Sequence, residues 1–314
     1  MTIVVADTGD IQAIEAFMPR DATTNPSLIT AAAQMLQYQG IVDETLQQAR
    51  QDLGATATTA QVVTLAFDRL AVSFGLKILQ IIPGRVSTEV DARLSYDSQA
   101  TIAKARELIA QYEAKGVSRK RILIKIAATW EGIQAASILQ KDGIDCNLTL
   151  IFSLTQAAAC ADANVFLISP FVGRILDWHV KNEGKTYTLE TDPGLASLKE
   201  IYAYYKAYDI KTMIMGASFR NQGQVEALAG CDSLTIAPPL LDALAKDMGS
   251  LPRRLDPSAA KDAPARMYLD EKSFRFMLNQ DAMATEKLAE GIRIFSHDMR
   301  SLRELVSKHL QMAA

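Results

Sequence analysis

Eight short apolar segments alternate with segments of helical period along this chain. Such alternation favours a parallel sheet, because neighbouring parallel strands need a crossover connection that is usually a helix. Eight repeats favour closure into a (β/α)8 TIM barrel over an open doubly wound sheet. We expect the strands at Thr2 to Ala6, Ala22 to Asn25, Ile81 to Glu89, Ile122 to Ala127, Ile144 to Ile151, Val165 to Ser169, Thr212 to Ala217 and Ser233 to Ala237.

Two regions fall outside the repeating pattern. Helical segments from Ile41 to Gln51 and from Thr58 to Gln80 precede the third strand. After the eighth strand, prolines and small polar residues predict a loop from Leu251 to Pro264. A long C-terminal helix, from about residue 281 to 312, keeps an apolar stripe and should pack on the barrel or on a partner subunit. Neither region requires further folding units, so we expect residues 1–314 to form one domain.

Composition excludes several classes of partner. The net charge of -3 and the lack of a Lys/Arg-rich segment argue against binding to nucleic acid. No segment has the roughly 18 consecutive apolar residues of a membrane span. Because no basic leader with an apolar core precedes Asp7, we expect a cytoplasmic protein.

The cysteines and histidines form no recognisable site in the sequence. Three widely spaced cysteines, set among apolar or small residues, are expected to be reduced thiols of the core: Cys146, Cys160 and Cys231. The histidines lie outside every motif, so neither a histidine-based triad nor a metal site is expected: His179, His297 and His309.

Lys125 is the only charged residue within the apolar strand from Ile122 to Ala127. Removal of an ammonium group from water disfavours its charged form, and the free amine is the nucleophile that condenses with a carbonyl group. Lys125 is therefore a candidate for Schiff-base formation. A lysine at this position could instead extend to solvent or form a structural ion pair with a buried carboxylate.

Polar side chains recur near the carboxyl ends of the predicted strands. Residues two positions apart on a strand share a face, and barrel enzymes place their active sites at this end of the strands. We therefore expect a site formed by Asp7 and by the pairs Thr23 and Asn25, Ser87 and Glu89, Asn147 and Thr149, and Ser169 and Phe171.

Seven segments carry these residues and others in a fixed order: Val5 to Asp10, Asp21 to Ser27, Pro83 to Arg93, Ile122 to Lys125, Cys146 to Thr149, Ile168 to Arg174 and Met215 to Arg220. Together they resemble the transaldolases, in the branch of the enterobacterial enzymes. The resemblance implies a TIM barrel without metal or organic cofactor. It also implies a homodimer that transfers a dihydroxyacetone unit between sugar phosphates in the non-oxidative pentose phosphate pathway.

The resemblance assigns catalytic roles to four residues. Lys125 is expected to attack the C2 carbonyl of fructose 6-phosphate or sedoheptulose 7-phosphate and to form an imine. Asp7 is expected to take the C4 hydroxyl proton when the C3–C4 bond breaks. Glyceraldehyde 3-phosphate or erythrose 4-phosphate leaves, and the enamine on Lys125 then adds to the other aldose phosphate. Glu89 and Thr149 match the pair that holds a catalytic water and moves protons during imine formation and hydrolysis.

The same resemblance assigns substrate contacts. The polar residues expected to face the dihydroxyacetone unit are Thr23, Asn25, Asn147 and Ser169. The expected phosphate ligands are Arg174, Ser218 and Arg220, beside a helix predicted from Asn221 to Ala229. Phe171 should keep water away from the enamine, because its ring is apolar. The related fructose 6-phosphate aldolases carry tyrosine at this position and glutamine in place of Glu89.

Three other functions remain open from the sequence. A pyridoxal phosphate enzyme also uses a lysine on a strand, but it is yellow as purified. A fructose 6-phosphate aldolase would release dihydroxyacetone without an acceptor. A non-catalytic sugar-phosphate binding protein would bind the substrate and form no imine.

Overall fold

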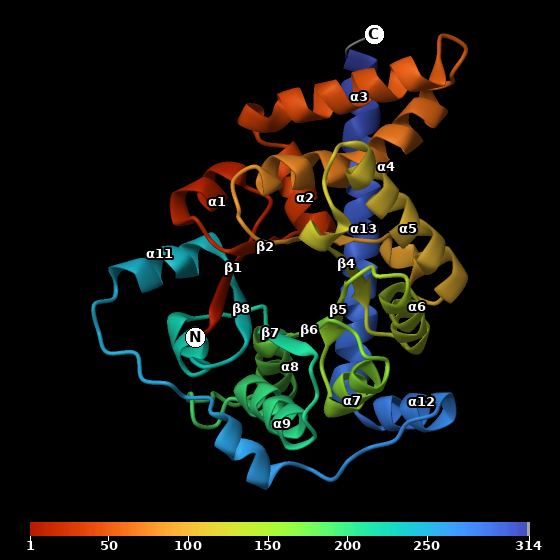
Figure 1. Cartoon of the computed structure of the whole chain (residues 1–314). Helices are drawn as coiled ribbons and strands as arrows, with labels where there is room; N and C mark the ends of the chain where they lie inside the picture. Colours follow the sequence, from red (N-terminus) through yellow and green to blue (C-terminus); the bar gives the residue numbers. More distant parts are fainter. Residues whose placement is uncertain (313–314) are drawn as a thin grey trace.

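A computed structural model describes residues 1–312 of the chain, and its strands form a closed barrel (Figure 1). All neighbouring strands are parallel, and β1 pairs with β8 to close the ring. The predicted (β/α)8 barrel is therefore confirmed. The strands are β1 (Ile3–Asp7), β2 (Asp21–Thr23), β3 (Val86–Glu89), β4 (Ile122–Ala127), β5 (Cys146–Ile151), β6 (Leu167–Pro170), β7 (Met213–Gly216) and β8 (Ser233–Ile236).

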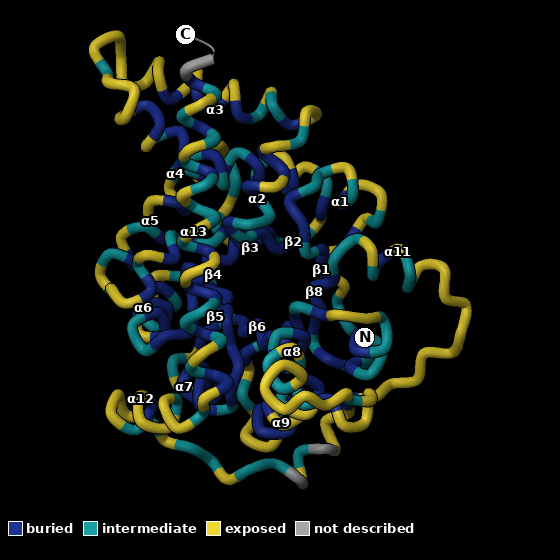
Figure 2. Tube along the Cα trace, turned by 180° about the vertical axis from the view of Figure 1, so that it is seen from behind, coloured by how far each residue is buried: buried dark blue, intermediate teal, exposed yellow. Residues whose placement is uncertain are grey.

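Helices lie outside the ring and cover its strands (Figure 1). Figure 2 shows that the strands are buried, whereas the outer turns of the helices are exposed. The helices between strands are α1 (Ile11–Phe17), α2 (Pro26–Ala33), α3 (Gln39–Leu53), α4 (Thr59–Leu79), α5 (Ser98–Ala114), α6 (Trp130–Lys141), α7 (Leu154–Asp162), α8 (Val172–Glu183), α9 (Pro193–Ala207) and α10 (Gln222–Glu226). Short 3-10 turns add η1 (Leu36–Tyr38), η2 (Ala92–Leu94) and η3 (Arg119–Arg121).

The additional helices before β3 are α3 and α4, as predicted. Thr58 begins α4 with a complete capping box, in which its hydroxyl accepts from the backbone of Gln61 and the Gln61 side chain accepts from the backbone of Thr58. These helices extend beyond the ring and enclose a second apolar cluster with α2 and the end of the C-terminal helix.

The C-terminal helix α13 (Ala282–Met312) is confirmed over almost the whole range predicted. It runs along one side of the barrel and packs on α2, α4 and α8 (Figure 1). Its buried stripe contributes to two clusters: Leu302, Val306 and Leu310 pack on the additional helices, and Leu288, Ile292 and Phe295 pack near the ends of the strands. The helix therefore joins the additional helices to the carboxyl ends of the strands.

Several boundaries differ from the sequence predictions. β3 begins at Val86 and not at Ile81, because α4 extends to Leu79 and the Pro83–Gly84 turn follows it. β2 ends at Thr23, since Asn25 leaves the strand to cap α2. The predicted loop after β8 contains the 3-10 turn η4 (Pro257–Asp262), and two flanking helices were not predicted: α11 (Pro238–Lys246) and α12 (Glu271–Gln280).

The cysteines lie in the apolar core, as predicted, with free and buried thiols. Burial raises the pKa of the Cys231 thiol to about 12. Within residues 1–312, no helix combines the length and the apolar character that a membrane crossing requires.

Candidate active site

The pairing of β3 with β4 places Glu89 directly beside Lys125. Partner residues on neighbouring parallel strands point to the same side of the sheet, so both side chains face the barrel interior. The Lys125 Nζ lies 3.3 Å from Glu89 Oε2, and the two side chains are only 5% and 4% exposed. Lys125 Nζ also donates to the carbonyl oxygen of Thr24 at 3.3 Å. The ion pair predicted as an alternative to catalysis is therefore present.

Asp7 lies at the end of β1, next to Thr23 in the register of β1 and β2. The Thr23 hydroxyl is 3.1 Å from Asp7 Oδ1, to which it can donate, and 2.8 Å from the hydroxyl of Thr235. Burial raises the pKa of the Asp7 carboxyl, although Lys125, Thr23 and Arg174 act in the opposite direction. Burial likewise raises the pKa of the Glu89 carboxyl, and Lys125 opposes it most strongly. The two carboxyl groups near the Lys125 amine thus bind protons more readily than ordinary carboxyl groups do.

A short chain of hydrogen bonds fixes the polar groups on β3, β5 and β6. Asn147, the register partner of Lys125 on β5, donates through Nδ2 to the hydroxyl of Ser87 at 3.2 Å. Its Oδ1 accepts from the Ser169 hydroxyl at 2.6 Å. Asn25 Oδ1 accepts from the backbone of Leu28 at 2.9 Å and caps α2. The orientation of each amide is therefore set by the fold.

Two buried oxygen atoms near Lys125 accept no hydrogen bond from the described residues: the Thr149 hydroxyl, and Glu89 Oε2, which has the ion pair with Lys125 at 3.3 Å. A buried polar atom without a partner carries an energetic cost, so a water or a ligand is the expected partner. Thr149 pairs with Ala127 in the register of β4 and β5. In the pairing of β5 with β6 the register shifts between Leu148 and Ile151, on either side of Thr149, and Leu150 has a φ of 58°. Such bulges reorient neighbouring side chains and are common beside active sites.

Arg174 lies in α8 with its guanidinium between two aromatic rings. Its Cζ is 5.1 Å from the centre of the Phe171 ring and 5.6 Å from that of Phe295. Burial lowers the pKa of Arg174, and the charge of Arg220 lowers it further. No hydrogen bond or ion pair within 4.0 Å joins its guanidinium to the described part of the chain. A cation without a partner at this position is suited to an anionic group of a ligand.

Arg220 follows β7 and is held differently. Its guanidinium donates to both carboxylate oxygens of Asp177, the closest at 2.7 Å, and to the hydroxyl of Ser218 at 3.3 Å. Gly173 allows this close packing, because a Cβ there would lie 2.1 Å from the Ser218 carbonyl oxygen and 2.8 Å from Arg220 Cγ. The helix predicted from Asn221 to Ala229 is only the short α10 (Gln222–Glu226). Its dipole is therefore small and contributes little to binding of a phosphate.

A cavity of about 180 Å³ collects most of these groups. The predicted residues that line it are Asp7, Thr23, Asn25, Lys125, Ser169, Phe171, Arg174, Ser218 and Arg220. Glu89, Asn147 and Thr149 are buried in the strands around it. Thr235 and Phe295 also line the cavity and were not predicted from the sequence. The alternation of β8 could have indicated Thr235, whereas nothing local in the sequence places Phe295 of α13 at the barrel mouth.

The arrangement can perform carbonyl chemistry on a phosphorylated substrate. It offers an amine paired with one carboxyl group, and a second carboxyl group, neutral hydrogen-bonding groups and two guanidinium groups that line the same cavity. Among the described residues, no group of three or more His, Cys, Asp or Glu side chains is placed to hold a metal ion.

Comparisons with known proteins agree with this geometry. Residues 4–306 match the family model described as transaldolase/fructose-6-phosphate aldolase. A protein named transaldolase from Methylococcus capsulatus is 62% identical over 312 residues, which are 99% of this chain and 95% of that protein. Proteins of the same name are 62% identical in Thermosynechococcus vestitus, covering 99% and 80%, and 57% identical in Rhizobium etli, covering 100% and 97%. The chain therefore belongs to the transaldolase/fructose-6-phosphate aldolase family.

Proposed function

We propose that this protein transfers a dihydroxyacetone unit from a ketose phosphate to an aldose phosphate through an imine on Lys125. The donors are sedoheptulose 7-phosphate and fructose 6-phosphate, and the acceptors are glyceraldehyde 3-phosphate and erythrose 4-phosphate. The observation that carries the proposal is the buried Lys125 amine, paired with Glu89, in a cavity that Asp7, Arg174 and Arg220 also line. The names of the relatives support the same reaction.

Imine formation requires proton transfer to and from the oxygen that leaves. Glu89 Oε2, which is ion-paired with Lys125, and the Thr149 hydroxyl both lack a hydrogen bond within the described residues, and a water held between them would bond to both. The raised pKa of Glu89 suits a group that gives a proton to the leaving hydroxyl and takes one back during hydrolysis. Asp7 takes the C4 hydroxyl proton during cleavage and returns it during addition.

Neutral groups orient the dihydroxyacetone unit of the substrate, and charged groups orient its phosphate. Asn25, Asn147 and Ser169 hold the hydroxyl groups of the dihydroxyacetone unit, and their fixed orientations favour one pose. Arg174 supplies the cation without a protein partner and binds the terminal phosphate. Arg220 lines the same cavity and joins Arg174 in binding the phosphate, with Asp177 holding its guanidinium in place.

Phe171 and Glu89 favour the transferase over the aldolase reaction. The Phe171 ring lines the cavity and packs edge-on against Phe152, with the ring centres 5.7 Å apart. Because phenylalanine has no hydroxyl group, this position offers the enamine no proton donor. An enamine without a proton donor at its carbon persists until an aldose arrives. The fructose 6-phosphate aldolases carry tyrosine in place of Phe171 and glutamine in place of Glu89.

Borohydride trapping tests the proposal directly. With fructose 6-phosphate, reduction should attach a three-carbon fragment to the peptide of Lys125 and to no other lysine. Lys125→Met should remain unlabelled while binding substrate. Label on another peptide would contradict the mechanism, and binding without label would indicate a non-catalytic binding protein. Release of dihydroxyacetone without an acceptor would indicate an aldolase, and a yellow protein with the absorbance of pyridoxal phosphate would indicate that cofactor.

We further propose that residues 1–314 act as one domain in a cytoplasmic homodimer of the pentose phosphate pathway. The resemblance to the family supports the dimer and the pathway. Free, buried cysteine thiols fit a reducing compartment. The packing of α13 on α2, α4 and α8 supports a single domain. Light scattering would measure the mass in solution, and a monomeric mass at assay concentrations would contradict the dimer.

A further inference from the structure

A second cavity lies behind Glu89, on the side of α4 and α5; we call it the rear cavity. Glu89 lines this rear cavity, whereas Lys125 lines the active-site cavity. The ion pair between Glu89 and Lys125 therefore forms the boundary between the two spaces. Asn25 lines both of them. The rear cavity is thus adjacent to the reacting amine but separate from the path of the substrate.

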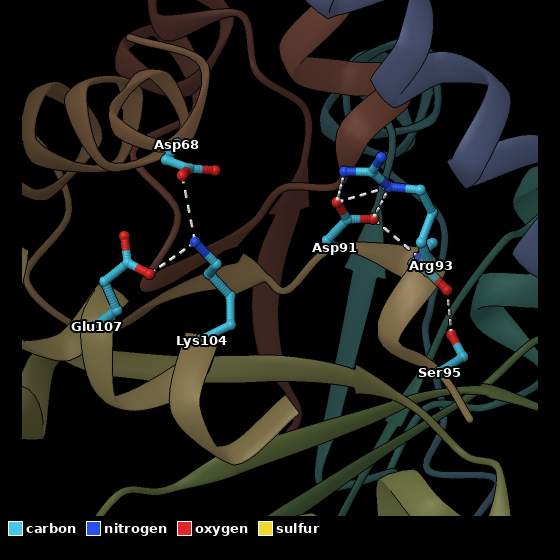
Figure 3. A network of polar contacts seen from close by, with 7 residues as sticks. Asp68, Asp91, Arg93, Ser95, Lys104 and Glu107 are labelled. Carbon is cyan, nitrogen blue, oxygen red and sulfur yellow. Dashed lines mark hydrogen bonds and ion pairs between the residues drawn. The ribbon is translucent and has the colours of Figure 1, made fainter. Parts of the chain in front are cut away.

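The two ends of the rear cavity are polar, and its wall is mostly apolar. At the inner end is Glu89, whose Oε2 is buried without a hydrogen-bond partner among the described residues. At the outer end Lys104 of α5 pairs with Asp68 of α4 at 3.2 Å, and these side chains are 23% and 24% exposed. Figure 3 shows Lys104 between the carboxylates of Asp68 and Glu107. Between the ends, Ala71 of α4 and Met299 of α13 contribute to the wall.

The size of the rear cavity restricts its occupant. Its volume is about 50 Å³, compared with about 180 Å³ for the active-site cavity. One water needs roughly 10 to 15 Å³ of such space and two to four polar partners, so a few waters fit and a sugar phosphate does not. The Glu89 carboxyl at the inner end, and the Asp68 carboxylate and Lys104 ammonium at the outer end, provide the partners. Burial raises the pKa of Asp68, with Lys104 opposing it, so the outer end is itself partly withdrawn from solvent.

We propose that the rear cavity is the route by which water leaves and reaches the imine at Lys125. The inference rests on the proposed function. In imine formation, the C–O bond of the carbinolamine breaks, its hydroxyl takes the proton of the Glu89 carboxyl, and water, the protonated imine and the Glu89 carboxylate result. That water moves past Glu89 into the rear cavity, and hydrolysis draws water from the same place.

A separate route solves a problem set by the site itself. While the imine exists, the remainder of the sugar phosphate occupies the active-site cavity between Lys125 and Arg174. The rings of Phe171 and Phe295 line the same space and exclude water from the enamine carbon. A path behind Glu89 supplies water to the nitrogen-bearing carbon when imine chemistry needs it, without opening the mouth.

Oxygen exchange measures this route. Fructose 6-phosphate labelled with oxygen-18 at C2 loses its label when the released water escapes before the imine is hydrolysed. The quantity of interest is the rate of label loss divided by the rate of imine formation, obtained by rapid-quench borohydride trapping. Ala71→Leu narrows the rear cavity from α4, and Met299→Phe narrows it from α13. We expect both variants to lower this ratio several-fold, because the same water returns to the imine.

The controls separate the possible failures. Ala110→Leu makes the same change at an exposed position of α5 and should leave the ratio at the wild-type value. The ratio of label loss to imine formation does not depend on the amount of folded enzyme. If one of the two cavity variants fails to fold, the other, in a different helix, still provides the test. An unchanged ratio in both folded variants would overturn the water route and leave the proposed function intact. Absence of trapping in the wild-type protein would instead overturn the proposed function.

Discussion

Replacement of Lys125 by methionine should leave Glu89 as a buried carboxyl without a nearby partner cation. Coulomb's law gives about 5 kcal/mol for unit charges at the observed 3.3 Å when the effective dielectric constant is about 20. Measured losses on removal of one partner of a buried pair are about 3 to 5 kcal/mol. We therefore expect Lys125→Met to lower the free energy of unfolding by about 3 kcal/mol at about pH 8.

The loss should depend on pH in a defined direction. Burial already places the folded-state pKa of Glu89 above its ordinary value of 4.5, and removal of Lys125 raises it further. A carboxyl group with a raised folded-state pKa stabilises the protein below the unfolded pKa, and this contribution is lost as pH rises through the folded pKa. The difference between variant and wild type should therefore grow by up to about 1.4 kcal/mol per pH unit above the wild-type pKa of Glu89. Removal of Lys125 also raises the pKa of Asp7 further, because Lys125 opposes the effect of burial there too.

Urea unfolding followed by circular dichroism, at several values between about pH 5 and pH 8, measures this difference. The double variant Lys125→Met, Glu89→Gln is the control, since its neutral amide removes the buried charge and most of the pH dependence. A difference between Lys125→Met and wild type that stays constant with pH would refute the reasoning. So would a double variant less stable than the single variant at the upper end of the range.

Three other substitutions test separate parts of the site. Thr149→Val removes a hydroxyl without a described partner, so stability should change by less than about 0.5 kcal/mol while rapid-quench trapping shows slower imine formation. Arg174→Met should lower kcat/KM for phosphorylated donors about 10- to 150-fold, equivalent to about 1.5 to 3 kcal/mol, and affect unphosphorylated fructose much less. Phe171→Tyr should raise acceptor-independent release of dihydroxyacetone and lower transfer to erythrose 4-phosphate; unchanged partitioning would assign the ring to packing.

The barrel and the relation of Lys125 to its neighbours were predictable from the period of the strands. Alternation of side chains placed Glu89, Lys125 and Asn147 on inward faces, and the register of β3, β4 and β5 brings these three into one row. This agreement has a physical cause, because parallel strands of a closed barrel allow few registers. Asn25 shows the limit of the rule. It lies beyond the end of β2 and caps α2, although it still lines the cavity together with Thr23.

Contacts between distant segments could not be predicted in this way. The apolar stripe of α13 indicated that Phe295 would be buried, but helical period does not say which surface a helix covers. Phe295 reaches the cavity because the helix packs closely beside the end of β5, where a Cβ at Gly291 would lie 2.6 Å from Leu150 Cδ2. The ion pair of Arg220 with Asp177 likewise joins two βα units and has no local signal.

The environments of Asp7 and Glu89 indicate how the site keeps its charge balanced through the proposed reaction. When the imine on Lys125 is protonated, its positive charge opposes the raised pKa of both carboxyl groups, as the ammonium does in the free enzyme. Cleavage gives a neutral enamine and removes that charge, so the pKa of Asp7 rises just as it receives the C4 hydroxyl proton. The net charge of the buried site is unchanged, and Asp7 retains the proton that the acceptor aldehyde will need. Glu89, which lines the rear cavity and forms the ion pair with Lys125, is instead placed to exchange its proton with water.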